Sequence, residues 1–299
     1  MTVINIGSIN IDHLYQVEHF VRPGETMASN SYQQVLGGKG ANQSVALAKA
    51  GGMVLHVGAV NRADGHIVAQ LQGYGVDTTQ INMVDQATGH AIIQLTNEAE
   101  NAIILYAGAN HQLTQAHIDE VLGQAQTGDW VLLQNETNLV GESICAAKRL
   151  GLNVAFNPAP MDAELTRSVL SNVDLLIVNE VEAMDLAGVD SIEAATVELP
   201  KQFPELAVLM TLGKAGVRYF SSEADESVPA FTVEARDTTA AGDTFIGFCL
   251  AELSQGATMK HAMIRACAAS AICVTKMGAA PSIPTAQEVT EFLDQQAHL

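Results

Sequence analysis

Basic residues are scarce in this sequence, and their scarcity limits the partners that the protein can have. Its 299 residues include 14 lysines and arginines against 33 aspartates and glutamates, so the formal net charge is −19. Such a charge repels the phosphate backbone of nucleic acids and anionic membrane surfaces. We therefore expect neither a nucleic acid nor a membrane as partner. A small anionic ligand is compatible with this charge, because backbone N–H groups at a helix start bind anions locally.

Long apolar runs and paired cysteines are also missing. No uninterrupted stretch of about 18 apolar residues, the length that a membrane-spanning helix needs, occurs in the chain. The first residues, MTVINIGSINID, lack the basic segment of a signal peptide, so we interpret them as a strand and a turn. The cysteines form no CxxC pair and lie in apolar helical patterns, which predicts buried thiols in a reducing compartment, the cytoplasm. They are Cys145, Cys249, Cys267 and Cys273.

Several signatures of nucleotide-binding and hydrolytic enzymes are absent as well. LGGKGAN (36–42) has glycine instead of Ser/Thr after Lys39, so it is not a Walker A loop. Gln43 stands where the dinucleotide-binding GxGxxG motif requires its last glycine. The nine histidines include no HExxH, and no GxSxG occurs. Zinc hydrolases, serine hydrolases and Rossmann dehydrogenases all lose support.

The apolar residues that are present predict an α/β fold. Hydrophobic residues make up 48% of the chain and charged ones 16%, which indicates a large interior. Short runs rich in Val, Ile and Leu alternate with helical patterns, and this alternation predicts right-handed βαβ units in a mainly parallel sheet. Ligands then bind at the carboxyl ends of the strands. The expected strands are 3–7, 54–60, 129–136, 153–158, 174–180 and 207–213, and the acidic segment 221–229 is expected to be a solvated turn.

Two segments interrupt the alternation. HAIIQL (90–95) and NAIILYAG (101–108) have no helix between them, which indicates a β-hairpin, and residues 13–36 form another extended piece. Together they predict a small antiparallel sheet. Its runs Ile92-Ile93 and Ile103-Ile104-Leu105 place apolar side chains on both faces. Both faces could fold against the main domain, but we favour a lid with one face over a ligand and the other against a partner subunit.

The segment AAGDTFIGFCLAEL (240–253) carries the strongest chemical signal. Its apolar spacing predicts a helix that begins near Gly242. The small residues before this helix let unpaired N–H groups converge on an anion, which the helix dipole also favours. Asp243 in the first turn would accept a proton from a nearby hydroxyl. An ordinary acidic first turn, with Asp237 capping the loop, explains the segment about equally well.

Three further motifs at predicted turns also have a functional and a purely structural interpretation. The glycines of GGKGAN (37–42) allow a ligand close to the backbone, or simply make a tight turn. Asn10 and Asp12 face the same side of an extended chain and suit vicinal hydroxyls of a polyol, or they serve turn chemistry. Asn179 and Glu182 could orient a hydrated Mg²⁺ and phosphates, or cap a helix.

Taken jointly, these motifs resemble those of the PfkB family of carbohydrate kinases, in the family's order over nearly the whole chain. The matching segments are GSINIDH (7–13), GGKGAN (37–42), AGAN (107–110), NPAP (157–160), NEVE (179–182), TLGKAGV (211–217), DTTAAGDTFIG (237–247) and GAAPSIP (278–284). The resemblance implies one three-layer α/β domain over residues 1–299, with a β-sheet lid at about 12–37 and 88–107. It also implies ATP-dependent phosphorylation of D-ribose at O5, which gives D-ribose 5-phosphate.

The resemblance further implies roles for single residues. Asp243 would be the general base, and the anion hole would be made by N–H groups of Ala240, Ala241, Gly242 and Asp243. The sugar would contact Asn10, Asp12, Gly38, Lys39, Asn42, Glu136 and Asp243. ATP would contact Asn179, Thr211, Gly213, Gly216 and Gly242, with Glu182 near Mg²⁺. A monovalent cation, K⁺, would bind at loops that contain Asp237, Thr239, Cys273, Lys276, Gly278 and Ser282. The lid is expected to join two subunits into a homodimer.

Two alternatives remain at this point. One is a kinase of the same family for another sugar, such as deoxyribose or fructose, or for a nucleoside. Asn10 with Asp12 favours a substrate with hydroxyls at C2 and C3, and only 5% aromatic residues offer little for a base pocket. The other is a sugar-binding protein without catalysis, which would not need the intact AAGD segment (240–243).

Overall fold

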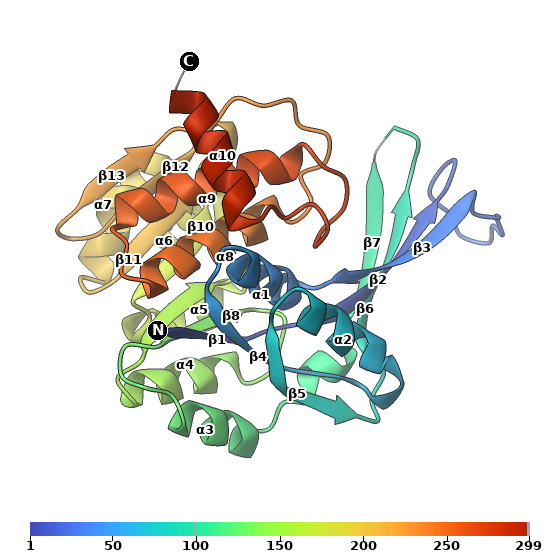
Figure 1. The fold of residues 1–299 in the computed structure, drawn as a ribbon, viewed down its shortest axis with the longest axis horizontal. Coiled ribbons are helices and arrows are strands. Elements are labelled where there is room, and N and C mark those ends of the chain that lie inside the picture. Colours follow the sequence, from blue (N-terminus) through green and yellow to red (C-terminus); the bar gives the residue numbers. More distant parts are fainter. Residues whose placement is uncertain (99, 298–299) are drawn as a thin grey trace.

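The large β-sheet forms the centre of the molecule. A computed structural model describes residues 1–98 and 100–297, and in this part of the chain nine strands join in the order β13-β12-β11-β10-β9-β8-β1-β4-β5 (Figure 1). β12 pairs antiparallel with β11 and with β13, and the other pairs are parallel. The strands are β1 (Thr2–Ile6), β4 (Met53–Asn61), β5 (Asp77–Val84), β8 (Trp130–Gln134), β9 (Asn153–Asn157), β10 (Leu175–Asn179), β11 (Ala207–Thr211), β12 (Val217–Phe220) and β13 (Asp225–Val228).

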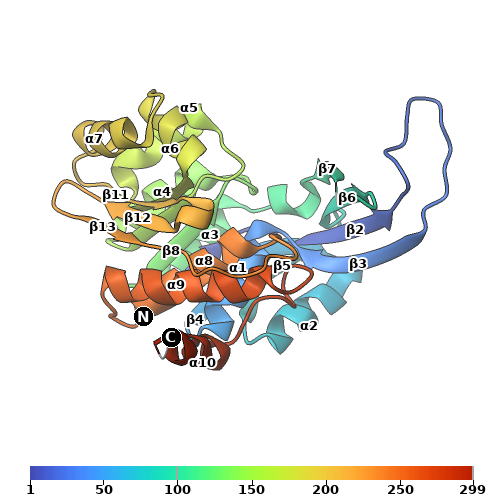
Figure 2. The same ribbon diagram turned by 90° about the horizontal axis from the view of Figure 1, so that it is seen from above.

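Helices cover both faces of this sheet, because its strands carry apolar side chains on both sides. In β8, Leu132 packs into one core cluster, and Val131 and Leu133 pack into the other. Figure 2 shows the two helix layers on opposite sides. One contains α1 (Lys39–Lys49), α2 (Gly65–Gly73), α8 (Ala241–Ser254), α9 (Met259–Val274) and α10 (Ala286–Ala297). The other contains α3 (Gln115–Gly123), α4 (Val140–Arg149), α5 (Ala163–Val169), α6 (Glu180–Ala187) and α7 (Ile192–Gln202). The predicted three-layer α/β class is confirmed.

A second, smaller sheet projects from one side of the molecule (Figures 1 and 2). Its strands are β2 (Asn10–Gln16), β3 (Ser31–Gly37), β6 (Gly89–Leu95) and β7 (Asn101–Tyr106), in the order β3-β2-β6-β7. The pairs β2–β3 and β6–β7 are antiparallel, whereas β2 and β6 run parallel. Ile103, Ile104 and Leu105 on β7 are all more than half exposed. Because neighbouring residues of a strand point to opposite faces, both faces of this sheet are apolar, as predicted.

Two predictions from the sequence are wrong. Cys145 is exposed, unlike the other three cysteines. It lies on α4 beside the buried Ile144, and its side chain points away from the core face of that helix. The acidic segment 221–229 contains the edge strand β13, which pairs with β12 and is joined to it by the ion pair Arg218–Asp225 at 2.6 Å. None of the described helices is long and apolar enough to cross a membrane.

Candidate active site

Polar residues gather where the carboxyl ends of the parallel strands meet the N-terminal ends of α1 and α8. A pocket of about 300 Å³ opens there. Parallel strands bring their carboxyl ends to one edge of the sheet, so residues that are far apart in the sequence share this pocket. Its lining includes Lys39, Asn157, Asn179, Glu182, Thr211, Ala240, Ala241, Gly242 and Asp243.

The glycines of GGKGAN are required by close packing at the start of α1. Gly38 has φ of 91°, a conformation that favours glycine. A Cβ at Gly40 would lie 2.4 Å from the backbone nitrogen of Ser8, and one at Gly37 would lie 2.1 Å from Oδ2 of Asp12. The turn therefore presses the backbone of α1 against the segment after β1. The missing side chain at Gly37 leaves room for the Asp12 carboxylate, which packs against the glycine.

Asp243 occupies the first turn of α8, as predicted, and two amide groups of α1 hold its carboxylate. Nδ2 of Asn42 donates to Oδ2 at 3.2 Å, and Nε2 of Gln43 donates to Oδ1 at 2.9 Å. Burial raises the pKa of Asp243 above its ordinary value, opposed by Lys39 and by the two amide donors, while Glu136 adds to the rise. The side chain remains partly exposed and lines the pocket, where a proton donor can reach it.

The start of α8 offers N–H groups to an anion. Ala240 precedes the helix in the left-handed region, with φ of 58°, and its side chain makes no cap. The N–H of Ala241 donates to the carbonyl of Thr238 at 3.2 Å. The N–H groups of Gly242 and Asp243 lie in the first turn, where no intrahelical acceptor exists. The N–H groups of Gly242 and Asp243 are therefore available to an anion, and Ala240 shapes the turn before them.

Several predicted sugar contacts lie where the chain passes from β1 of the main sheet to β2 of the small sheet. Lys39 N–H and the hydroxyl of Ser8 both donate to Oε2 of Glu136, the former at 3.0 Å. The carboxylate of Asp12 accepts no hydrogen bond from the described residues. Burial and the nearby Glu136 raise the pKa of Asp12 to about 6. Its carboxylate is therefore poorly solvated and ready to accept hydrogen bonds from a ligand.

Asn10 is held by Asn110, a residue that the sequence analysis did not assign. Nδ2 of Asn110 donates to Oδ1 of Asn10 at 2.8 Å, and Oδ1 of Asn110 accepts from the N–H of Ile9 at 2.9 Å. A Cβ at Gly89 would lie 2.2 Å from Nδ2 of Asn110. Asn110 belongs to the segment AGAN (107–110), whose match to the family was the available signal for it.

The predicted nucleotide contacts divide into two groups. Asn179 and Glu182 form a capping box on α6: Oδ1 of Asn179 accepts from Glu182 N–H at 2.8 Å, and Oε2 of Glu182 accepts from Asn179 N–H at 2.9 Å. Both also line the pocket with Thr211, so capping and ligand binding are compatible. Gly213 and Gly216 lie outside its lining. A Cβ at Gly216 would lie 2.1 Å from the carbonyl oxygen of Val228, which gives that glycine a structural role.

The six residues predicted around a monovalent cation come from the loop before α8 (Asp237, Thr239), the last turn of α9 (Cys273) and the loop after α9 (Lys276, Gly278, Ser282). Asp237 joins the loops, since it accepts from the N–H groups of Thr239 at 2.9 Å and Gly278 at 2.8 Å. Burial alone would raise the pKa of Asp237, but these donors outweigh it and lower the pKa. Sγ of Cys273 lies 3.1 Å from Oγ of Ser282 and 3.7 Å from the carbonyl of Thr239. The ammonium of Lys276 pairs with Glu288 at 2.8 Å.

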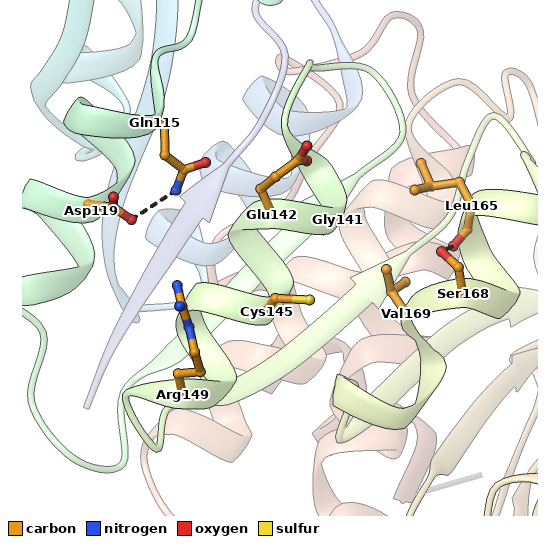
Figure 3. Close-up of a pocket in the computed structure, with 9 residues that line it drawn as sticks. All are labelled: Gln115, Asp119, Gly141, Glu142, Cys145, Arg149, Leu165, Ser168 and Val169. Carbon is orange, nitrogen blue, oxygen red and sulfur yellow. Dashed lines mark hydrogen bonds between the residues drawn. The ribbon is translucent and has the colours of Figure 1, made fainter.

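Other concentrations of polar or apolar residues lie outside this site. A hollow of about 640 Å³ lies between α3, α4 and α5, lined by Gln115, Asp119, Cys145, Arg149, Leu165 and others (Figure 3). Within the described residues, no group of three or more His, Cys, Asp or Glu side chains is placed to hold a metal ion. The polar pocket at the strand ends is therefore the candidate active site.

The fold and this pocket place the chain among the carbohydrate kinases. The profile of the pfkB family of carbohydrate kinases matches residues 2–286, so the chain belongs to the PfkB family, as its motifs predicted. A ribokinase of Haemophilus influenzae is 39% identical, and the alignment covers 98% of each chain. A deoxyribokinase of Salmonella typhi is 32% identical over 98% of this chain and 99% of its own. The structure of Arabidopsis thaliana ribokinase complexed with ribose and ATP has a TM-score of 0.86 and 29% identity, and the match covers 98% of each chain.

Proposed function

We propose that the protein transfers the γ-phosphoryl group of ATP to O5 of D-ribose, giving D-ribose 5-phosphate. One arrangement carries the proposal: the carboxylate of Asp243, whose pKa is raised by burial, lies in the same helical turn as the free N–H of Gly242. A hydroxyl that loses its proton to Asp243 would attack a phosphoryl group held by the N–H groups of Gly242 and Asp243. The full-length similarity to ribokinases of 33–39% identity supports ribose as the substrate.

The mechanism needs positioning and charge stabilisation more than covalent chemistry, because phosphoryl transfer passes through a loose, charge-rich transition state. Asp12 and Asn10 would bind vicinal hydroxyls of the sugar, since the carboxylate of Asp12 is largely buried and accepts no hydrogen bond from the described residues. Asp243 would then accept the proton of O5. The N–H groups of Gly242 and Asp243 would stabilise the charge on the transferred group.

ATP would occupy the pocket beside Asn179 and Thr211, both of which line it. Glu182, which lines the same pocket, would help to hold a hydrated Mg²⁺, and the ion would supply neutralisation of phosphate charge. K⁺ would bind the two loops that Asp237 joins, mostly through backbone carbonyls. The bound ion would fix the start of α8, since Cys273 at the end of α9 accepts a hydrogen bond from the α8 residue Thr244 at 3.3 Å.

The small sheet would act as a lid within a single domain, and a second copy of the lid would cover its exposed apolar face. Ile104 is 64% exposed and Leu105 is 61% exposed, on opposite faces of β7. One face would close over the sugar and the other would bury in a homodimer. Light scattering of the wild type and of Ile104→Lys tests this proposal, which predicts a dimer that the substitution weakens. The expected location is the cytoplasm, where free thiols remain reduced.

A substrate panel tests the proposed function. Release of ADP is measured with ribose, deoxyribose, fructose and adenosine, and the highest kcat/KM is expected for ribose. A deoxyribose kinase is the second candidate, because a deoxyribokinase is among the relatives. Turnover of deoxyribose above ribose would favour it.

Asp243→Asn tests the catalytic step separately. This variant should bind ribose in calorimetry but should lose turnover. If its rate stayed near that of the wild type, Asp243 would not be the base.

A further inference from the structure

Gln43 lies beside the base and belongs to a chain of buried polar groups that crosses the centre of the protein. Gln43 lies in the second turn of α1, and its side chain is fully buried. Nε2 donates to Oδ1 of Asp243 at 2.9 Å and to Oδ1 of Asn157 at 3.2 Å. Both hydrogens of the amide are therefore used, and one of them fixes the direction of the carboxylate.

The carbonyl of Gln43 is fixed from the other side. Nε2 of Gln134 donates to Oε1 of Gln43 at 2.7 Å and to Oδ1 of Asn5 at 3.0 Å. Gln134 and Asn5 are fully buried on β8 and β1. Because Gln134 donates in both directions, Gln43 can present only its NH₂ group to Asp243. The arrangement has a cost, since Oε1 of Gln134 is buried without a hydrogen-bond partner in the described structure.

The other end of this series of buried polar groups also has fixed donors and acceptors. Nδ2 of Asn5 donates to Oγ of Ser44 at 2.8 Å, and Ser44 lies 2.8 Å from Nδ1 of His56. Nε2 of His56 lies 3.2 Å from the carbonyl oxygen of Gly7, which can only accept. His56 is therefore the Nε2–H tautomer, and its Nδ1 accepts from Ser44. Burial lowers the pKa of His56 to about 4, so the imidazole stays neutral at neutral pH.

We propose that Gln43 is a positioning residue for catalysis: held by Gln134 and Asn5, its amide fixes the direction of the Asp243 carboxylate toward the sugar hydroxyl. This inference rests on the proposed function, in which Asp243 is the general base. A neutral amide contributes orientation without placing another charge beside the phosphoryl group.

The consequence for pH dependence has a definite sign. Gln43 and Asn42 donate to the Asp243 carboxylate, Lys39 attracts it, and Glu136 repels it. Loss of the Gln43 donor removes one of the interactions that lower the pKa of Asp243. Asp243 would then stay protonated to a higher pH, so the acidic limb of the kcat/KM profile should move to higher pH.

Gln43→Met tests the proposal, because methionine has a similar length and no hydrogen-bonding amide. We expect kcat to fall about 10- to 100-fold, as for a misplaced catalytic group, with the KM of ribose and of ATP changed much less. Gln134→Met leaves Gln43 in place but frees it to rotate, so it should show a smaller change in the same direction. If Gln43→Met does not fold, Gln134→Met alone decides.

Leu47→Ala is the matched control, since Leu47 is fully buried one turn further along α1 and contacts none of these polar groups through hydrogen bonds. It should lower the melting temperature without moving the acidic limb. The proposal is overturned if the Gln43 and Gln134 variants leave both kcat and the acidic limb unchanged, or if Leu47→Ala moves the limb equally. An inactive Asp243→Asn with an unaffected Gln43→Met would refute this inference alone, whereas an active Asp243→Asn would refute the proposed base.

Discussion

Replacing Asp12 by asparagine is expected to stabilise the ligand-free protein while removing its affinity for the sugar. The carboxylate is largely buried, accepts no hydrogen bond from the described residues and lies near Glu136. Its ionisation in the folded protein is therefore unfavourable. Asparagine keeps the shape of the side chain and removes the charge.

The magnitude and its pH dependence follow from the pKa of Asp12. This pKa rises from 3.8 to about 6 on folding, a difference of about two pKa units, or about 3 kcal/mol at 1.36 kcal/mol per unit. Because the folded-state pKa is the higher one, the folded protein binds more protons between these values, so a rise in pH lowers stability. The penalty removed by Asp12→Asn is about 1.5 kcal/mol at about pH 5 and reaches about 3 kcal/mol at about pH 8.

Urea unfolding of the ligand-free wild type and of Asp12→Asn, at one protein concentration and at both pH values, measures this difference. Asp190→Asn is the control, because it removes one negative charge from an exposed position. The Asp12 variant should also lose ribose binding in calorimetry, since hydrogen bonds to a charged group contribute about 1.5–3 kcal/mol each. An Asp12→Asn protein no more stable than the wild type at the higher pH, or a difference independent of pH, would refute the reasoning.

Substitutions at two further positions probe the backbone around the site. Gly37→Ala would place a Cβ 2.1 Å from Oδ2 of Asp12, so the carboxylate must move. We expect the KM of ribose to rise at least about tenfold with little change in melting temperature, and an unchanged KM would contradict this. Ala240→Val puts a β-branched residue at φ of 58° and should lower both kcat and stability, whereas Ala240→Gly should retain activity. Equal activity of the two variants would show that this turn does not shape the anion hole.

Periodicity predicted the layers of the fold well because the central strands are buried on both faces. Runs such as DLLIVNE (174–180) have no polar alternation, and the strand β10 lies at Leu175–Asn179 as expected. Edge strands carry weaker signals, since one side faces solvent. The strand β13, DESV, has the composition of a turn, and only pairing with β12 makes it a strand.

For the site, motifs identified the residues at turns but not the residues that support them. Asp243 and Gly38 stand in glycine-rich segments, where unusual composition draws attention. Asn5, Gln134 and His56 are single polar residues inside apolar strands, and nothing local distinguishes them from residues that face solvent. Their role appears only when the parallel register brings β1, β4 and β8 side by side.

The choice of neutral donors around Asp243 has a chemical reason. An arginine in the place of Gln43 would form a stronger, charge-assisted hydrogen bond and would hold the carboxylate at least as firmly. It would also lower the pKa of Asp243, and a weaker base removes a sugar proton less well. An amide gives direction at a smaller cost in basicity, and burial raises the pKa in opposition to it. Gln43 and Asn42 orient the carboxylate and lower its pKa, whereas desolvation raises the pKa, so the loss of either amide costs orientation and shifts the pKa upward.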